Sequence, residues 1–199
     1  KDFTITFAEV LAGNGIRVIM SESTCATPAL SYATASRQAS AGVMITASHN
    51  PPNWNGIKIK SPNGASASPE AISSIEEIIA NFPANREPPR LDFNQAVRSG
   101  MIEIADLNST YVSKLEKMLD TRALKNAPLK VVFDSMFGSG SGYLPRLLEG
   151  GEMGIIEINS GPNPAFPGIK QPEPIEHNLG KLSSAVTDIG AGVGLATDG

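Results

Sequence analysis

The sequence predicts an α/β protein of two three-layer α/β/α domains with mixed sheets, over residues 1–95 and 96–199, each truncated at the outer chain end. Helical and strand patterns alternate along the chain, as they do in layered α/β proteins. The continuously apolar run 41–47 is short for a helix, which is typical of a strand buried on both faces. The 199 residues are enough for two domains of about 100 residues each.

In the first half, apolar periodicity and turn residues predict three helices and three strands. Asn14-Gly15 ends the first helix, and Pro28 opens the second at a position that needs no N–H donor. Ser68 is an expected N-cap before Pro69, and the isoleucines that follow form one apolar stripe. The expected elements are helices at 4–13, 27–38 and from residue 69, and strands at 16–20, 41–47 and 57–60.

From residue 81 onward, three proline- or glycine-rich segments separate the periodic ones. Segment 81–92 has three prolines and no periodicity, which predicts a linker or a loop at a domain edge. The Gly/Ser residues of 134–140 predict a tight strand-to-helix turn, and the glycines of 138–142 lack the spacing of a dinucleotide fingerprint. Segment 159–174, with five prolines, predicts an ordered loop. The expected elements are helices at 106–121, around 143–148 and at 175–187, and strands at 129–133, 154–158 and 192–196.

Composition and charge argue against several functional classes. The chain has 20 acidic and 16 basic side chains and a net charge of −4, whereas a general nucleic-acid binder needs a basic face. It contains no run of about 18 apolar residues that could span a membrane, and no apolar signal segment follows Lys1. The single cysteine, Cys25, suits a reducing compartment. We therefore expect a cytoplasmic protein without nucleic-acid or membrane partners.

The segment 42–58 carries the residue types of a reaction centre. A strand leads to Ser48 and His49 at its end, where α/β proteins place their sites. Pro51-Pro52 stiffen the loop behind them, and an Asn-Gly turn lets Lys58 return toward the same end. A hydroxyl nucleophile, an imidazole and an ammonium group can together support phosphoryl transfer. From residue types alone an ordinary polar loop fits equally well, and a serine hydrolase is disfavoured because no G-x-S-x-G motif is present.

The order of residues in this loop resembles a known enzyme family. Thr-Ala-Ser-His-Asn-Pro at 46–51, followed by Asn-Gly-Ile-Lys at 55–58, is similar to the active-site serine loop of the α-D-phosphohexomutases, the phosphoglucomutase/phosphomannomutase family. The resemblance extends over the whole chain. It includes 129–134 with the Gly/Ser turn, Phe166-Pro167, Pro172-Glu173-Pro174, 176–179, and 194–199, which is similar to the start of the family's metal loop, Asp-Gly-Asp-x-Asp-Arg.

This resemblance implies an isomerase that interconverts hexose 1-phosphate and hexose 6-phosphate, of glucose or mannose, through a 1,6-bisphosphate. Ser48 would carry the phosphate, primed by a hexose 1,6-bisphosphate as activator. Asp198 and the phosphate on Ser48 would hold Mg²⁺, although Asp198 can also be a simple turn residue. Lys58 is the favoured acid/base group, since desolvation can lower the pKa of a lysine, and His49 either shares proton transfer or orients the loop.

Two alternatives stay open at this point. The substrate can be an amino sugar phosphate, although the loop at 166–174 looks more like the glucose/mannose branch. The chain can also be a non-catalytic phosphosugar-binding module that kept the loop. Because the family has four domains, the resemblance further implies that this chain covers about the first two. On that expectation the remaining metal ligands follow Gly199, and the isolated chain lacks turnover.

Overall fold

A computed structural model describes residues 1–51 and 53–199, so the predicted stiffening by Pro52 lies outside the described residues. The α/β class is confirmed, because helices accompany both parallel and antiparallel strand pairs. The chain divides into two compact units: Lys1–Ser23, Thr27–Ile45 and Ile57–Leu107 form the first, and Thr24–Ala26, Thr46–Gly56 and Asn108–Gly199 form the second. The expected domain boundary between residues 95 and 96 stays a prediction.

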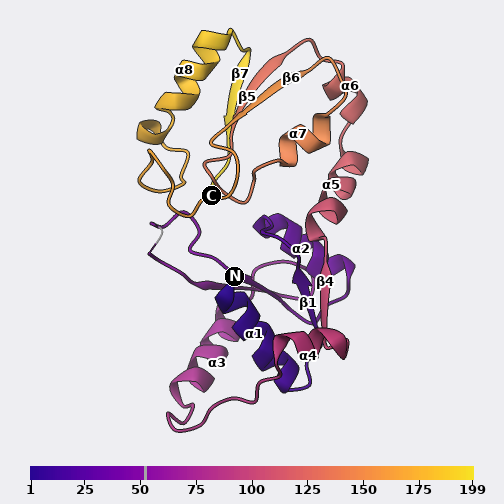
Figure 1. The fold of residues 1–199 in the computed structure, drawn as a ribbon, viewed down its shortest axis with the longest axis vertical. Helices are drawn as coiled ribbons and strands as arrows, with labels where there is room; N and C mark the ends of the chain where they lie inside the picture. The colour runs from indigo at the N-terminus through magenta and orange to yellow at the C-terminus, as the bar shows by residue number, and fades with distance from the viewer. Residues whose placement is uncertain (52) are drawn as a thin grey trace. The chain divides into compact units, whose positions relative to one another are not determined.

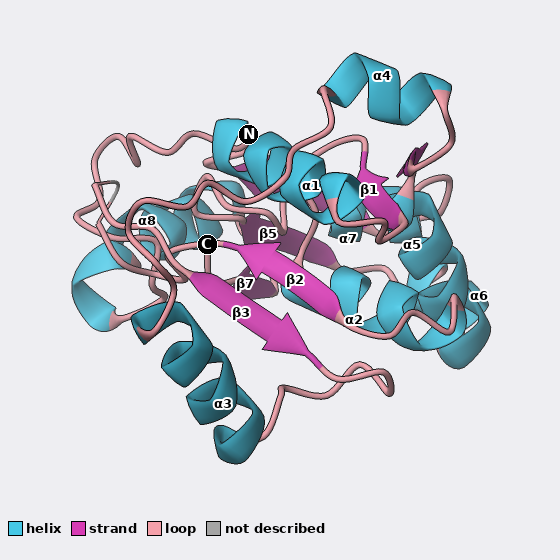
Figure 2. Ribbon diagram, turned by 90° about the horizontal axis from the view of Figure 1, so that it is seen from below, coloured by secondary structure: helices cyan, strands magenta, loops and turns pink. Residues whose placement is uncertain are grey.

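The first unit contains two small sheets. Strands β1 and β4 pair in parallel with Val18 opposite Ile102, whereas β2 and β3 form an antiparallel hairpin with Ile45 opposite Ile57. Figure 2 shows β2 and β3 side by side. The elements are helices α1 (Asp2–Gly13), α2 (Thr27–Ser36), α3 (Pro69–Ala80) and α4 (Phe93–Arg98), and strands β1 (Val18–Ser21), β2 (Gly42–Ile45), β3 (Ile57–Lys60) and β4 (Ile102–Ala105).

The core of the first unit joins α1, α4 and β4. Its buried members are Ala8, Ala12, Ala96 and Ile102. The predicted loop 81–92 contains no helix or strand and lies against α1. There the Leu91 N–H donates to the Glu9 carbonyl oxygen at 3.0 Å, and Arg90 pairs with the Glu9 carboxylate. This loop is therefore part of the first unit.

Two helices and one strand were not expected from periodicity. Helices α4 and α6 (Thr121–Lys125) have six and five residues, which is shorter than the window in which a helical period can be recognised, and strand β4 has only four residues. The sequence does contain N-cap residues for both helices. At α4, Asp92 Oδ1 accepts from Gln95 N–H at 3.0 Å, and at α6, Asp120 Oδ1 accepts from Ala123 N–H at 2.9 Å.

Strand β2 is only half-buried beyond Gly42, whereas the sequence predicts burial on both faces. The physical reason is that its only hydrogen-bonded neighbour among the strands of residues 1–51 and 53–199 is β3. Helix α3 begins as predicted, because Ser68 Oγ accepts from Ala71 N–H at 3.3 Å. The apolar stripe of this helix is exposed, however, with Ile78 and Ile79 each 67% accessible.

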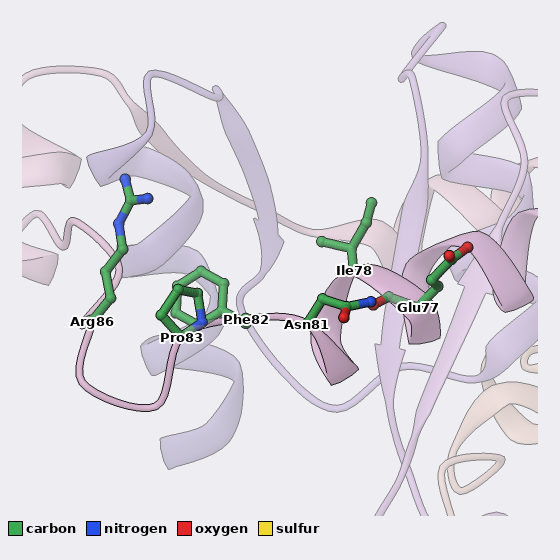
Figure 3. Close-up of a pocket in the computed structure, with 6 residues that line it drawn as sticks. All are labelled: Glu77, Ile78, Asn81, Phe82, Pro83 and Arg86. Atoms are coloured by element: carbon green, nitrogen blue, oxygen red, sulfur yellow. The ribbon is translucent and has the colours of Figure 1, made fainter.

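The end of α3 and the segment 81–86 that follows it line an open hollow of about 400 Å³ (Figure 3). Its lining is formed by Glu77, Ile78, Asn81, Phe82, Pro83 and Arg86. None of the predicted site residues lines this hollow.

The second unit is a parallel sheet in the order β6-β5-β7 with helices on both faces. Val131, Val132 and Phe133 of the central strand are buried in succession, as expected when both faces are covered. Figure 1 shows α7 and α8 on opposite sides of the strands. The elements are β5 (Lys130–Asp134), β6 (Gly154–Ile158), β7 (Val193–Ala196), α5 (Leu107–Met118), which begins at the last residue of the first unit, α6, α7 (Tyr143–Leu148), the 3₁₀ helix η1 (Glu176–Asn178) and α8 (Gly180–Ile189).

The helix predicted at 175–187 is thus divided, since it starts as a 3₁₀ turn and becomes α-helical at Gly180. In the described part of the chain, no helix combines the length and the apolar character that a membrane crossing requires.

Candidate active site

The loop between β2 and β3 holds the predicted serine and is closed at its base. Thr46 N–H donates to the Gly56 carbonyl oxygen at 2.9 Å, directly beyond the last β2–β3 pair. Within the loop, the N–H and Nδ2 of Asn50 both donate to the Ala47 carbonyl oxygen, at 3.1 and 2.8 Å. These local bonds give the loop a defined shape around residue 48.

Ser48 has a left-handed backbone conformation, with φ = +56°. Its N–H donates to Thr46 Oγ1 at 2.9 Å, a bond that helps to hold this turn. A left-handed conformation costs a residue with a side chain roughly 1–2 kcal/mol, and such strain is concentrated at functional sites. Several other non-glycine residues share this conformation, so the functional role of Ser48 stays a prediction.

His49 lies against Asp198, which is distant in the sequence. The Nδ1 atom of His49 is 3.7 Å from Oδ2 of Asp198, and the two side chains are 44% and 53% exposed. This separation is longer than a hydrogen bond, and the contact is an ion pair only when the imidazole is protonated. The second unit thus brings the serine loop and the carboxylate together, as the metal-site hypothesis requires.

Lys58 lies in the first unit, on β3 opposite Met44, with its side chain exposed. Ser48, His49 and Asp198 all belong to the second unit. The catalytic roles of Ser48, His49 and Lys58, and the metal-binding role of Ser48 and Asp198, stay predictions.

Asp198 follows β7 at the carboxyl edge of the parallel sheet, the edge at which α/β proteins bind ligands. Thr197 N–H donates to the Asp134 carbonyl oxygen at 3.0 Å and so continues the pairing with the central strand. Gly199 N–H donates to Asp198 Oδ1 at 2.9 Å and to the Pro172 carbonyl oxygen, also at 2.9 Å. The backbone on both sides of Asp198 is therefore anchored.

The turn after β5 needs glycine because it lies very close to the segment that contains Gly199. A Cβ atom added to Gly138 would lie 2.4 Å from the Gly199 Cα, and one added to Gly199 would lie 2.3 Å from Pro172 Cγ. Real Cβ atoms essentially never come so close. The turn is thus a strand-to-helix connection, as predicted, and its glycines also allow it to pack against the segment that carries Asp198.

A buried polar network lies at the same edge, and the sequence analysis did not identify it. Asp134 is fully buried. Its Oδ1 accepts from Met136 N–H at 2.8 Å, and both its carboxylate oxygens accept from Asn159 Nδ2, at 3.0 and 3.1 Å. Asn159 Oδ1 accepts in turn from Lys181 Nζ at 2.6 Å. One signal was available, because Asp134 and Asn159 end two neighbouring apolar strands, and buried polar groups at such ends need partners.

The oxygen donors of this edge suit a hard divalent cation but form only part of a site. Carboxylate and phosphate oxygens are ligands that Mg²⁺ prefers. Thr197 Oγ1, next to Asp198, is buried without a hydrogen-bond partner among the described residues. Over residues 1–51 and 53–199, no three His, Cys, Asp or Glu side chains gather as a metal-binding group. Ser48 and Asp198 alone therefore do not make a complete cation site, and their metal-binding role stays a prediction.

Comparison with known proteins identifies relatives for both halves of the chain. Residues 1–86 match phosphoglucomutase/phosphomannomutase, alpha/beta/alpha domain I, and residues 109–199 match domain II of the same family. The chain is 36% identical over 173 residues to a protein of Methanosphaera stadtmanae named as a phosphoglucosamine mutase, covering 87% of this chain and 36% of the relative. It is 36% identical over 177 residues to a phosphoglucomutase/phosphomannomutase of Thermococcus kodakarensis, with the same coverage.

The fold agrees with a solved structure. A crystal structure from Thermus thermophilus, named as a phosphomannomutase, aligns with a TM-score of 0.85 and 33% identity, covering 100% of this chain and 43% of that one. The chain spans 36% of the length of the two relatives named above. The resemblance expected from the serine loop is confirmed, as is the α/β/α layering, and the chain belongs to the phosphoglucomutase/phosphomannomutase family.

Proposed function

We propose that the complete protein from which this chain comes interconverts hexose 1-phosphate and hexose 6-phosphate through a phosphorylated Ser48 and a 1,6-bisphosphate. One observation carries this proposal: Ser48 has a left-handed backbone in a closed loop, and the adjacent His49 contacts Asp198. A nucleophile in a hydrogen-bonded loop whose next residue contacts a carboxylate fits a phosphate carrier that works with a cation. Membership of the family supports the same chemistry.

The proposed transfer starts with phosphate on Ser48. A free hydroxyl of the bound sugar phosphate attacks the phosphorus, and the new sugar P–O bond forms while the bond to Ser48 Oγ breaks. The hydroxyl proton passes to Lys58, the proposed acid/base group, and from Lys58 to Ser48 Oγ as the bond between that oxygen and phosphorus breaks. The bisphosphate then reorients in the site, and its other phosphate returns to Ser48 by the reverse step. The number of phosphates is unchanged, and a hexose 1,6-bisphosphate supplies the first one.

The negative charge of a phosphate on Ser48 has to be offset by nearby groups. A phosphorylated Ser48 carries about 1.5 to 2 negative charges and three acceptor oxygens. When bound by this phosphate and Asp198, Mg²⁺ would offset the charge that develops during transfer. His49 follows Ser48 in the chain and its Nδ1 atom lies 3.7 Å from Asp198 Oδ2, so His49 is proposed to orient the phosphate or to assist proton transfer.

Lys58→Met in the complete protein is expected to slow turnover by about 10²- to 10⁴-fold, the usual contribution of a general acid/base. Ser48 should still be phosphorylated, because the substitution leaves the loop unchanged. The measurement combines steady-state turnover with intact-mass analysis. Lys60→Met is the matched control, since Lys60 follows two residues later on the same face of β3. Unchanged turnover in Lys58→Met would eliminate this lysine as the acid/base group.

The substrate is testable with three sugars. On the basis of the proline-rich loop at 166–174, we expect the complete protein to convert glucose 1-phosphate or mannose 1-phosphate with a kcat/KM about tenfold or more above that for glucosamine 1-phosphate. A specific observation favours the second candidate, an amino sugar phosphate mutase, because the Methanosphaera stadtmanae relative is named for that activity. A preference for glucosamine 1-phosphate would establish the second candidate and reject the first.

A further inference from the structure

Gly199 lies between two backbone segments of the second unit. One contains Gly138 and the other contains Pro172, which is fully buried. Both contacts are too close for any side chain at Gly138 or Gly199. Because Asp198 is the preceding residue, a shift of either segment must move the backbone that carries the carboxylate. Two buried asparagines hold these segments in place. Asn178 acts through its side-chain amide, and Asn159 acts through its main-chain carbonyl oxygen and through its side-chain bonds to Asp134.

Asn178 holds the segment with Pro172. Its side chain belongs to a residue that is only 5% exposed. The Nδ2 group donates to the carbonyl oxygens of Gln171 at 3.0 Å and Glu173 at 2.9 Å, on either side of Pro172. The carbonyl oxygen of Pro172 then accepts from Gly199 N–H at 2.9 Å. One amide group thus sets the direction of the carbonyl to which Gly199 is bonded.

Asn159 holds the turn with Gly138. Its carbonyl oxygen accepts from Phe137 N–H at 2.8 Å and from Ser135 Oγ at 3.1 Å, while its side chain binds the buried Asp134. Met136 and Phe137 both have left-handed backbones, with φ of +48° and +57°. Each such residue costs roughly 1–2 kcal/mol, so the turn needs bonds of this kind to keep its shape.

We propose that Asn159 and Asn178 are positioning residues for Asp198: they hold the two segments that enclose Gly199 and thereby direct the carboxylate toward the serine loop. This inference rests on the proposed function, because it assigns both residues to the support of a cation ligand. Neither asparagine was identified by the serine motif or by the metal-loop resemblance. Residues that bond to a metal ligand or to its neighbours can orient the ligand without contacting the metal.

The test measures Mn²⁺ binding to the complete protein, by electron paramagnetic resonance of the free ion. Asn178→Ala is expected to weaken Mn²⁺ binding about tenfold or more, since loss of a supporting partner typically lowers metal affinity 10- to 100-fold. Turnover at saturating Mg²⁺ should recover in part, and the KM for hexose phosphate should stay near its original value. Asn159→Ala keeps the main-chain carbonyl oxygen that binds the turn and removes the side-chain bonds to Asp134, so we expect a smaller loss of Mn²⁺ affinity in the same direction. Asn81→Ala is the matched control, since it removes an exposed amide that donates to the Glu77 carbonyl oxygen at 2.8 Å.

A folded Asn178→Ala protein with unaltered Mn²⁺ affinity would overturn the inference while leaving the proposed function intact. Wild-type protein that binds no Mn²⁺ would overturn both. Should Asn178→Ala fail to fold, Gly138→Ala decides the question, because its added methyl group must displace Gly199. Weaker Mn²⁺ binding in folded Gly138→Ala supports the positioning role, and unaltered binding rejects it.

Discussion

Ser48→Ala is expected to remove both the protein-bound phosphate and the mutase turnover of the complete protein. The hydroxyl of Ser48 is the proposed phosphate carrier, and water in its place cannot hold the group for return to the sugar. By analogy with removal of other covalent nucleophiles, turnover should fall by about 10⁴-fold or more. Intact-mass analysis should show one phosphate on the wild-type protein after treatment with hexose 1,6-bisphosphate, and none on the variant.

Two controls separate chemistry from structure in this experiment. Ser48→Gly relieves the left-handed backbone, since glycine adopts φ = +56° without strain, yet it should be equally inactive. Ser74→Ala removes an exposed hydroxyl on α3, which donates to the Glu70 carbonyl oxygen at 2.9 Å, and should keep both phosphate and activity. A wild-type protein that never carries phosphate on Ser48 would instead favour the non-catalytic phosphosugar-binding module.

The serine loop was predictable because its signals are local. A short apolar strand, the Asn-Gly turn and the two residue motifs all lie within 42–58, and the resulting hairpin with Ile45 opposite Ile57 agrees with them. The left-handed backbone of Ser48 was not predictable, because serine has no general preference for it. The bond from Ser48 N–H to Thr46 Oγ1 and the closure by Thr46 and Gly56 support it, and both depend on how the loop folds.

The support of Asp198 was harder to foresee, because it depends on tertiary packing. The sequence places Asp198 after a strand, but the approach of Gly138 and Pro172 to Gly199 depends on how two loops distant in the sequence fold against it. Asn178 has its partners only five and seven residues away, at Glu173 and Gln171. Nevertheless, the loop containing them has no period, so their contact could not be inferred from spacing.

Asp198→Asn is expected to lower turnover of the complete protein by about 10²- to 10³-fold at limiting Mg²⁺. The amide keeps the size of the side chain, and its oxygen can still accept from Gly199 N–H, a bond of 2.9 Å in the wild-type chain. What it loses is the negative charge that a hard cation prefers in a ligand. Turnover should therefore rise again as Mg²⁺ is increased, and Mn²⁺ binding should weaken in parallel.

The matched control is Asp188→Asn, which removes the same charge from an exposed position on α8 of the same unit. It distinguishes a local ligand effect from a change in net charge, because both variants alter the net charge by one unit. If Asp198→Asn and Asp188→Asn have the same Mg²⁺ dependence as the wild-type protein, Asp198 is a turn residue after β7. If only Asp198→Asn requires more Mg²⁺, the carboxylate beside His49 is a cation ligand, and the serine loop and the end of β7 form one reaction centre.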